Sequence, residues 1–127
     1  MAVAPDHSRG RVPHGQHVSI MAHEVIRYAH LGWLGGSHPL EQKKLGTLGG
    51  ATLLRFEPGF ADPSWCANGH AGYVLEGCLR LEFADAVVDV EAGEGFVVDP
   101  ETGHRASNPG RVAVIVFIAP FVAPRAP

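Results

Sequence analysis

The sequence predicts an all-β protein, a sandwich or barrel of short strands around one core. Its 127 residues include 16 glycines and 10 prolines, which interrupt helices and form turns. No window of useful length places apolar residues at helical spacing, whereas about eight to ten short apolar segments are separated by turn residues. A chain of this length can bury one core but not two, so we expect a single β domain.

The first strands are predicted from β-favouring residues between glycine and proline breaks. Residues 23–29 combine valine, isoleucine and tyrosine, which favours one short strand before an irregular connection. Residues 40–45 carry two successive lysines, as an edge strand often does. Residues 51–56 lie between a Gly-Gly pair and a Pro-Gly pair, and these breaks bound a stronger strand candidate.

A tight turn is predicted at Asn68-Gly69, inside a stretch that runs from residue 59 to residue 77. Asn-Gly favours the positive φ angles of a two-residue hairpin turn. Residues 65–67 and 70–76 are therefore expected to pair as neighbouring strands. His70 then lies one residue past the turn, on rigid backbone.

The second half of the chain continues the pattern of short strands. Residues 79–83 alternate apolar and charged side chains, which is typical of a half-buried strand, and residues 87–90 return as their partner. Residues 96–98 and a short segment that begins at His104 follow, each after a turn that contains glycine. Residues 112–118 form a continuous apolar run, which predicts a strand in the middle of a sheet with both faces covered.

We predict three parts along the chain. Residues 1–22 lack a hydrophobic period and are expected to be a mobile N-terminal arm with solvated histidines. Residues 23–120 form the β domain, and residues 121–127 form a C-terminal tail. The histidines of the arm are His7, His14 and His17.

Composition indicates the surroundings of the domain. The formal charge is −3, from 10 basic and 13 acidic residues without a long run of either sign, which argues against nucleic acid as a partner. No apolar run is long enough to span a bilayer or to act as a secretory signal, so we expect no membrane partner and a cytoplasmic location. In that compartment Cys66 and Cys78 are expected to be reduced thiols.

Two histidines occupy equivalent positions in successive strand units. His70 and His104 are 34 residues apart, and each begins a predicted strand after a glycine-containing turn. A folded sheet of this size encloses a space at one end, where we expect the two side chains to meet. They are candidates for metal ligands, or for a general base and a hydrogen-bond donor to a small polar substrate. The alternative is two core histidines whose nitrogens bond to the backbone.

Two stretches share a spacing of glycines and histidines. The first runs from Gly59 through Trp65-Cys66 and His70 to Gly77, and the second runs from Gly93 through His104 to Asn108. With one gap a residue short, they resemble the two motifs of the cupins, G-x5-H-x-H-x3,4-E-x6-G and G-x5-P-x-G-x2-H-x3-N. The resemblance covers residues 50–119, and it implies a single cupin-type jelly-roll β-barrel with a ligand or metal site inside.

The resemblance also implies a metal site whose ligand positions are only partly kept. The positions at which metal-binding cupins carry ligands hold Trp65, Ala67, His70 and His104 here. Tryptophan and alanine donate no electron pair to a metal, so His70 and His104 are the metal-ligand candidates. The candidate metals are divalent zinc, iron, manganese and nickel.

Two histidines do not complete a metal site, so a further ligand would have to come from Cys66, Glu76, Glu101 or water. Strand alternation argues against Cys66, because it turns the thiol away from its inward-facing neighbours. We therefore expect an inert buried sulfur at this position.

Other contacts with a ligand are assigned by position. Trp65 offers a flat face to an apolar or sugar-like ligand, with core filling as the alternative. We assign Trp65, Ala67 and Tyr73 to ligand binding, and His70 and His104 to catalysis. Two arginines, Arg80 and Arg105, are candidates for binding a carboxylate, although surface ion pairing is the commoner role.

These residues lead to three hypotheses for function. The first is binding of a small polar metabolite, an organic acid or a sugar-like molecule, in the barrel, with metal weak or absent. The second is a metal-dependent cupin enzyme of the isomerase or dioxygenase type, with His70 and His104 as ligands. The third is a metal-free, non-catalytic sensing module. In each case a homodimer formed through the sheet and the N-terminal strands is expected.

Overall fold

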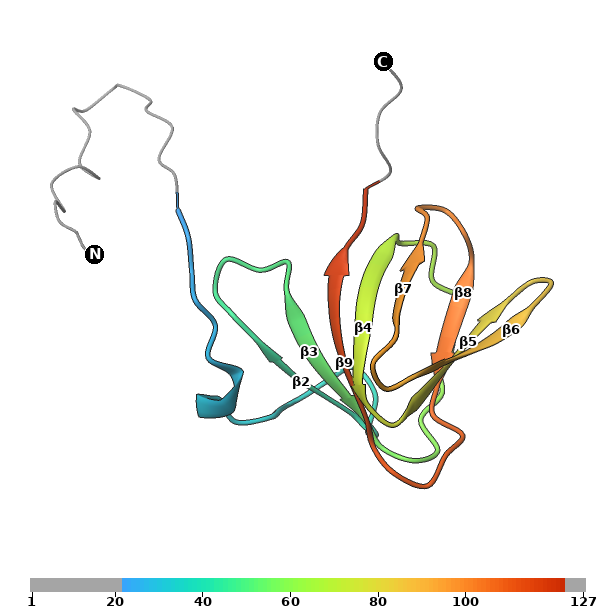
Figure 1. The fold of residues 1–127 in the computed structure, drawn as a ribbon, viewed down its shortest axis with the longest axis horizontal. Coiled ribbons are helices and arrows are strands. Elements are labelled where there is room, and N and C mark those ends of the chain that lie inside the picture. Colours follow the sequence, from blue (N-terminus) through green and yellow to red (C-terminus); the bar gives the residue numbers. More distant parts are fainter. Residues whose placement is uncertain (1–21, 123–127) are drawn as a thin grey trace, which may run out of the picture.

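The computed structural model describes residues 22–122, which fold into two antiparallel β-sheets (Figure 1). The larger sheet has the strand order β1-β2-β3-β9-β4-β7, and the smaller sheet has the order β6-β5-β8. The strands are β1 (Leu34–Gly35), β2 (Glu41–Leu45), β3 (Thr52–Phe56), β4 (His70–Glu76), β5 (Cys78–Phe83), β6 (Val87–Glu91), β7 (Gly95–Val98), β8 (His104–Ser107) and β9 (Val114–Pro120). In Figure 1 the two sheets approach each other at the lower end and diverge upward.

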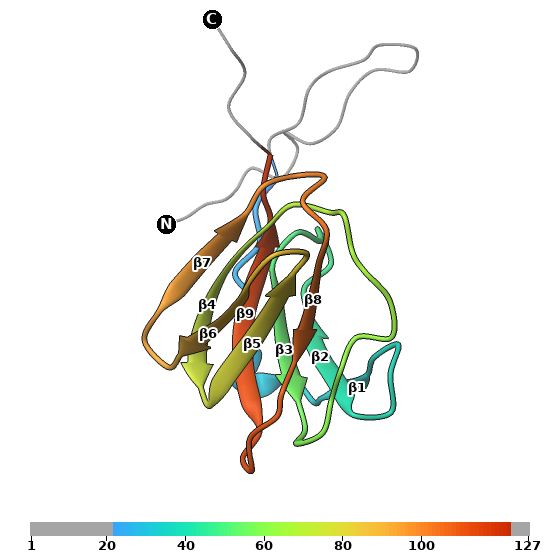
Figure 2. The same ribbon diagram turned by 90° about the vertical axis from the view of Figure 1, so that its right-hand side faces the viewer.

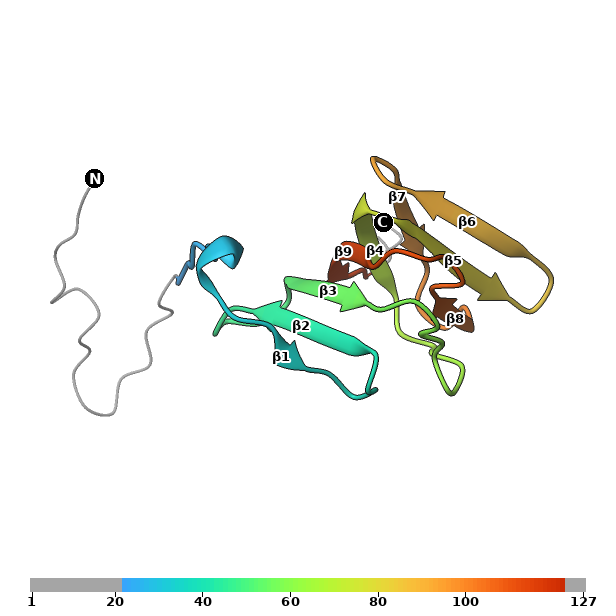
Figure 3. The same cartoon turned by 90° about the horizontal axis from the view of Figure 1, so that it is seen from below.

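The predicted all-β class is confirmed, and the nine strands of the described region fall within the expected range. The two sheets are not closed into a barrel. Figure 3 shows the open arrangement: β1 and β2 extend to the left of the view, and β6 lies at the upper right. Across residues 22–122 no helix has the length and hydropathy needed to cross a bilayer. The predicted arm and tail, with His7, His14 and His17, lie outside the described residues except for residues 22, 121 and 122.

The continuous apolar run near the C-terminus forms the central strand, as predicted. Strand β9 pairs with β3 on one side and with β4 on the other. Its three consecutive residues Val114, Ile115 and Val116 are all buried, so both faces of the strand are covered at this point. The buried apolar side chains that pack into one core cluster are Phe56, Phe60, Val74, Leu79, Leu81, Val90, Val114 and Val116.

The predicted hairpin at Asn68-Gly69 is wrong. Strand β4 pairs with β7 and β9, whereas Cys66 forms an isolated bridge with His104 on the other sheet. The turn pair therefore marks a crossing from one sheet to the other. Gly69 does not take a positive φ angle, and a side chain there would collide with the carbonyl oxygen of Phe121. The glycine is required by close approach, not by turn geometry.

The predicted strand over residues 23–29 is also wrong. This segment ends in a short 3₁₀ turn, η2 (Tyr28–His30). Long-range contacts fix it: the Tyr28 hydroxyl donates to the carbonyl oxygen of Ala51 at 3.2 Å, and Lys44 Nζ donates to the carbonyl oxygen of Tyr28 at 2.9 Å. The edge of β2 at Gln42 and Lys43 is taken by β1.

Candidate functional site

A cavity of about 560 Å³ lies between the two sheets. It extends to the end where β4 and β8 both begin, the upper end in Figure 1. Its walls are apolar along the sheets, and they carry polar side chains at the strand starts. The apolar walls include Leu54, Phe56, Leu79, Leu81, Val116 and Ile118, and the polar end includes Asp62, Cys66, His70 and His104.

The structure brings His70 and His104 together inside this cavity, as predicted. His70 begins β4 in the larger sheet, and His104 begins β8 in the smaller sheet. His70 Nδ1 lies 3.3 Å from His104 Nε2, and the two rings are nearly perpendicular at 86°. His104 is 4% exposed, whereas His70 is half-buried. The two imidazoles therefore share one hydrogen bond across the gap between the sheets.

The protonation of the pair follows from its surroundings. His104 Nδ1 lies 2.9 Å from the carbonyl oxygen of Thr102, which only accepts, so Nδ1 carries the proton and the lone pair of Nε2 faces His70 Nδ1. Burial lowers the pKa of His70, the nearby His104 lowers it further, and Asp62 opposes both effects. A lowered pKa keeps His70 neutral at pH 7, which is the form that binds metals.

The expected direction of the Cys66 thiol is wrong. One ligand atom from each of Cys66, His70 and His104 lies within 4.8 Å of the others. Cys66 is bridged directly opposite His104, and directly opposed residues in an antiparallel pair project to the same side. The alternation that we expected for Trp65, Cys66 and Ala67 does not apply, because these residues form a single bridge instead of a regular strand.

A bridging segment, residues 59–67, holds Cys66 in this position by pairing along the outer edge of β8. Cys66 and His104 exchange backbone hydrogen bonds at 2.8 and 2.9 Å, and Asp62 N donates to Ala106 O at 2.9 Å. The Asp62 carboxylate accepts from Ala106 N at 2.8 Å. Figure 2 shows this segment running beside β8 before the chain crosses to β4. One sequence signal could have placed Cys66 in the site. Cys66 lies four residues before His70, in a stretch that proline and glycine interrupt, so it need not follow strand alternation.

The other predicted contact residues divide into two groups. Trp65 and Ala67 line the cavity, with the Trp65 side chain 49% exposed at its mouth. Tyr73 does not line the cavity; on β4 it alternates with Gly72 and the buried Val74 and is itself 49% exposed. Its ring is placed on the outer face of the larger sheet. Cys66 and Asp62, which we did not assign to the site, take part in the cavity wall.

Both arginines considered for a carboxylate are already paired. Arg80 Nε lies 2.9 Å from Asp89, and Arg105 Nη2 lies 2.6 Å from Glu82. The Arg105 guanidinium also stacks over the Trp65 ring at 4.4 Å. Surface ion pairing, the commoner alternative, is the observed arrangement.

Fold and cavity together define a two-sheet β protein with two imidazoles and a thiol in the hollow between its sheets. The chain belongs to the cupin family: residues 52–119, more than half of its length, match the family described as Cupin domain. The resemblance inferred from the two motifs is thereby confirmed. No curated protein matches the sequence.

Three of the solved structures with a similar fold illustrate the likeness. KdgF from Halomonas sp. is 20% identical, with a TM-score of 0.59 over 75% of this chain and 91% of that chain. The polyketide cyclase RemF from Streptomyces resistomycificus is 20% identical, with a TM-score of 0.60 over 78% and 80%. An RmlC-like cupin from Shewanella frigidimarina is 19% identical, with a TM-score of 0.59 over 80% and 93%. At such low identity this likeness shows the fold alone.

Proposed function

We propose that this cupin holds a divalent transition metal on Cys66, His70 and His104, and that the metal faces a small ligand bound in the cavity. The observation that carries the proposal is the convergence of three ligand atoms within 4.8 Å. Ligand atoms around a tetrahedral zinc ion lie about 3.3–3.6 Å apart, as bond lengths near 2.0–2.3 Å require. The 3.3 Å between His70 Nδ1 and His104 Nε2 fits that spacing.

The chemistry of the donor set supports zinc before the other candidates. One thiolate and two neutral imidazoles suit zinc, whereas manganese prefers oxygen ligands. Three protein ligands leave one tetrahedral position open, which is the pattern of catalytic zinc sites. The bond from His104 Nδ1 to Thr102 O also fits, because metal-bound histidines commonly donate their other nitrogen to a carbonyl.

Of the enzyme hypotheses, this donor set favours the isomerase type over the dioxygenase type. When bound, a zinc ion supplies a Lewis acid, or lowers the pKa of a bound water. His70 and His104 supply the lone pairs that hold it, Thr102 fixes the orientation of His104, and the apolar walls limit water around the ligand. A first step toward function is therefore to establish the metal.

Cobalt titration of untagged, chelator-treated protein tests the proposal. We expect one equivalent of Co²⁺ to bind, with a thiolate-to-cobalt charge-transfer absorption that Zn²⁺ abolishes. Cys66→Ala should remove that absorption, and His104→Ala should weaken binding by more than about 100-fold. Cys78→Ala is the matched control and should behave like the wild type, because Cys78 does not line the cavity.

Two results would contradict the metal site. If the wild-type protein binds less than half an equivalent of cobalt and of zinc, the metal site is wrong. The metal-free binding protein and the metal-free sensing module would then be the remaining hypotheses. An absorption that disappears in Cys78→Ala and persists in Cys66→Ala would place the metal elsewhere.

The homodimer stays a prediction, and the outer face of the larger sheet supports it. Tyr73, Leu75 and Val97 are exposed there, at 49%, 46% and 60%. Apolar side chains gathered on one face are typical of an interface between copies. Sedimentation equilibrium of the wild type and of Tyr73→Glu tests it, and a wild-type monomer at micromolar concentration would exclude it.

A further inference from the structure

The cavity that holds the candidate metal ligands is negatively charged and lacks a cationic wall. Of its lining residues, Glu41 and Asp62 carry carboxylates, and none is a lysine or an arginine. The Asp62 carboxylate accepts one hydrogen bond from Ala106 N, and Glu41 Oε1 accepts one from the Ser37 hydroxyl at 3.1 Å. Neither carboxylate is neutralised by an ion pair in the described residues.

The nearest cations do not change this balance. Arg105 stacks on Trp65 at the mouth of the cavity, but its guanidinium is bound to Glu82 at 2.6 Å. Lys43 is two residues from Glu41 on β2, yet it is not a lining residue. A divalent metal held by the Cys66 thiolate has part of its charge cancelled by that thiolate. The two carboxylates then still leave the cavity with a net negative charge. Asp62 lies toward the polar end, and Glu41, which pairs with Phe56, lies toward the other end, so an anionic ligand would meet like charge at either end.

The walls of the cavity between its two ends suit a hydrocarbon body. Leu79, Leu81, Phe96 and Val116 form apolar walls from both sheets. Burying apolar surface there contributes about 25 cal/mol for each Å² removed from water. A ligand that fits this cavity thus combines an apolar ring or chain with a head group that donates hydrogen bonds to carboxylates.

We propose that the ligand is a neutral or cationic molecule with an apolar body and a hydroxyl or ammonium head group, and that free carboxylates and phosphates are disfavoured. This inference rests on the proposed function in taking the cavity as the ligand site, but it does not depend on the metal. Of the two ligand classes expected from the sequence, it favours hydroxylated, sugar-like molecules over organic acids.

A matched series of three probes tests the proposal. 2-Cyclohexylethanol, 2-cyclohexylethylamine and cyclohexylacetate share one apolar body and differ in the charge of the head group. Trp65 lines the cavity, so its fluorescence reports binding in a Trp33→Phe background, where it is the one remaining tryptophan. In chelator-treated protein we expect the alcohol and the amine to bind about tenfold more tightly than the carboxylate.

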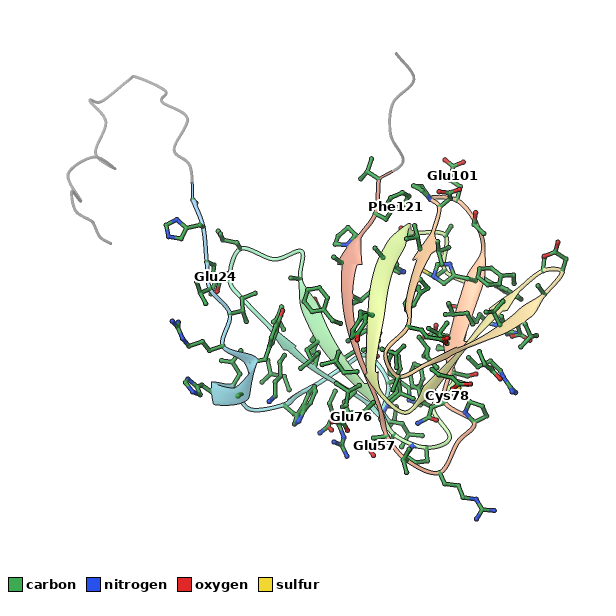
Figure 4. The ribbon with its side chains drawn as sticks, in the orientation of Figure 1. Glu24, Glu57, Glu76, Cys78, Glu101 and Phe121 are labelled. Atoms are coloured by element: carbon green, nitrogen blue, oxygen red, sulfur yellow. The ribbon has the colours of Figure 1, made fainter. Side chains whose placement is uncertain are left out.

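Two cavity variants and one control complete the test. Glu41→Gln and Asp62→Asn should each reduce, severalfold, the ratio of the affinity for the amine to the affinity for the carboxylate. Glu76→Gln removes a carboxylate that does not line the cavity, at the lower end of the view in Figure 4, and should leave this affinity ratio unchanged. Equal or tighter binding of cyclohexylacetate overturns the proposal, as does the absence of saturable binding by all three probes. If zinc does not bind but the order of affinities holds, the metal site fails and the ligand class stands.

Discussion

The two outer edges of the smaller sheet are built in opposite ways. At the β8 edge, the bridging segment (residues 59–67) pairs with the strand through backbone hydrogen bonds at Asn108, Ala106 and His104. At the β6 edge, no strand of the described region pairs on the outer side. Side chains there remain open to solvent, with Val87 59% and Val88 45% exposed.

The hydrogen-bonded edge, here called the closed edge, is the one that carries candidate metal ligands, and the β6 edge, the open edge, carries none. Cys66 and His104 both lie on the closed edge, and His70 reaches them from the facing sheet. Ligand atoms must be held within a few tenths of an ångström, which a hydrogen-bonded edge can provide and an open edge cannot. The open edge needs only enough apolar contact to complete the core. Substitutions on the closed edge should therefore be costly, and those on the open edge tolerated.

The largest effect is expected at Asn108, where the closed edge turns toward β9. This side chain is 1% exposed; its amide donates to Phe56 O and to Val112 O at 2.9 Å, and its oxygen accepts from Gly110 N at 3.0 Å. Asn108→Ala leaves these backbone groups without partners and should lower the free energy of unfolding by about 3 kcal/mol or more. Urea denaturation measures the change.

A substitution on the open edge provides the matched comparison. Val88→Thr, on β6, should change the free energy of unfolding by less than about 1 kcal/mol, because the side chain is already half exposed. If Val88→Thr destabilises the protein as much as Asn108→Ala, the contrast between the edges is wrong.

The next effect concerns Glu101, which connects the loop before β8 to the bridging segment. Its amide donates to Ala67 O at 2.7 Å, and its φ angle of 71° is in the left-handed region. A β-branched residue is strained there, so Glu101→Val should lose about 1–2 kcal/mol of stability. It should also weaken cobalt binding, because the adjacent Thr102 orients His104.

Glu101→Gly separates backbone strain from loss of the side chain. Glycine adopts a positive φ at no steric cost, so this variant should match the wild type in stability within about 1 kcal/mol and should keep its cobalt affinity. Equal losses in the glycine and valine variants would show that the carboxylate matters and the backbone angle does not.

The sequence predicted the strands that carry the two histidines, because alternation and turn residues are local signals. His70 and His104 begin β4 and β8 as expected. It failed at Cys66 and at Asn68-Gly69, whose geometry depends on partners far along the chain. Cys66 takes its direction from a bridge to His104, and Gly69 is required by the backbone near Phe121. Neither relation appears in a local pattern.

The comparison extends to the two thiols. Cys66 lines the cavity, and its sulfur accepts from Asn68 N at 3.5 Å, whereas burial and the nearby Asp89 raise the pKa of Cys78. A raised pKa lowers the thiolate fraction, and the thiolate is the form that reacts. At pH 8 iodoacetamide should therefore modify Cys66 severalfold faster than Cys78, as measured by peptide mass spectrometry.

Zinc should then slow the labelling of Cys66 by about tenfold or more, because a metal-bound thiolate is protected, and should leave Cys78 unaffected. Faster reaction at Cys78, or no protection of Cys66 by zinc, would show that the closed edge does not hold Cys66 in position as a metal ligand.

The smallest effect is expected from the ion pair that joins β5 to the open strand β6. Arg80 donates to both carboxylate oxygens of Asp89, at 2.9 and 3.3 Å, and this hydrogen bonding lowers the pKa of Asp89. A folded-state pKa below the unfolded value, near 3.9, means that the pair stabilises the fold above that pH. The stabilisation is lost as the pH falls through the lowered folded-state pKa.

Asp89→Asn should therefore be slightly less stable than the wild type at pH 7, and the difference should vanish in acid. Both side chains are more than 40% exposed, so 1 M salt should also reduce the difference. Urea denaturation at pH 7 and at pH 3, with and without salt, measures it. Asp89→Asn could instead lower the free energy of unfolding at pH 7 as much as Asn108→Ala does. The β6 edge would then depend on one charge pair, and the two edges would differ in the kind of bond that holds them and not in how well they tolerate substitutions.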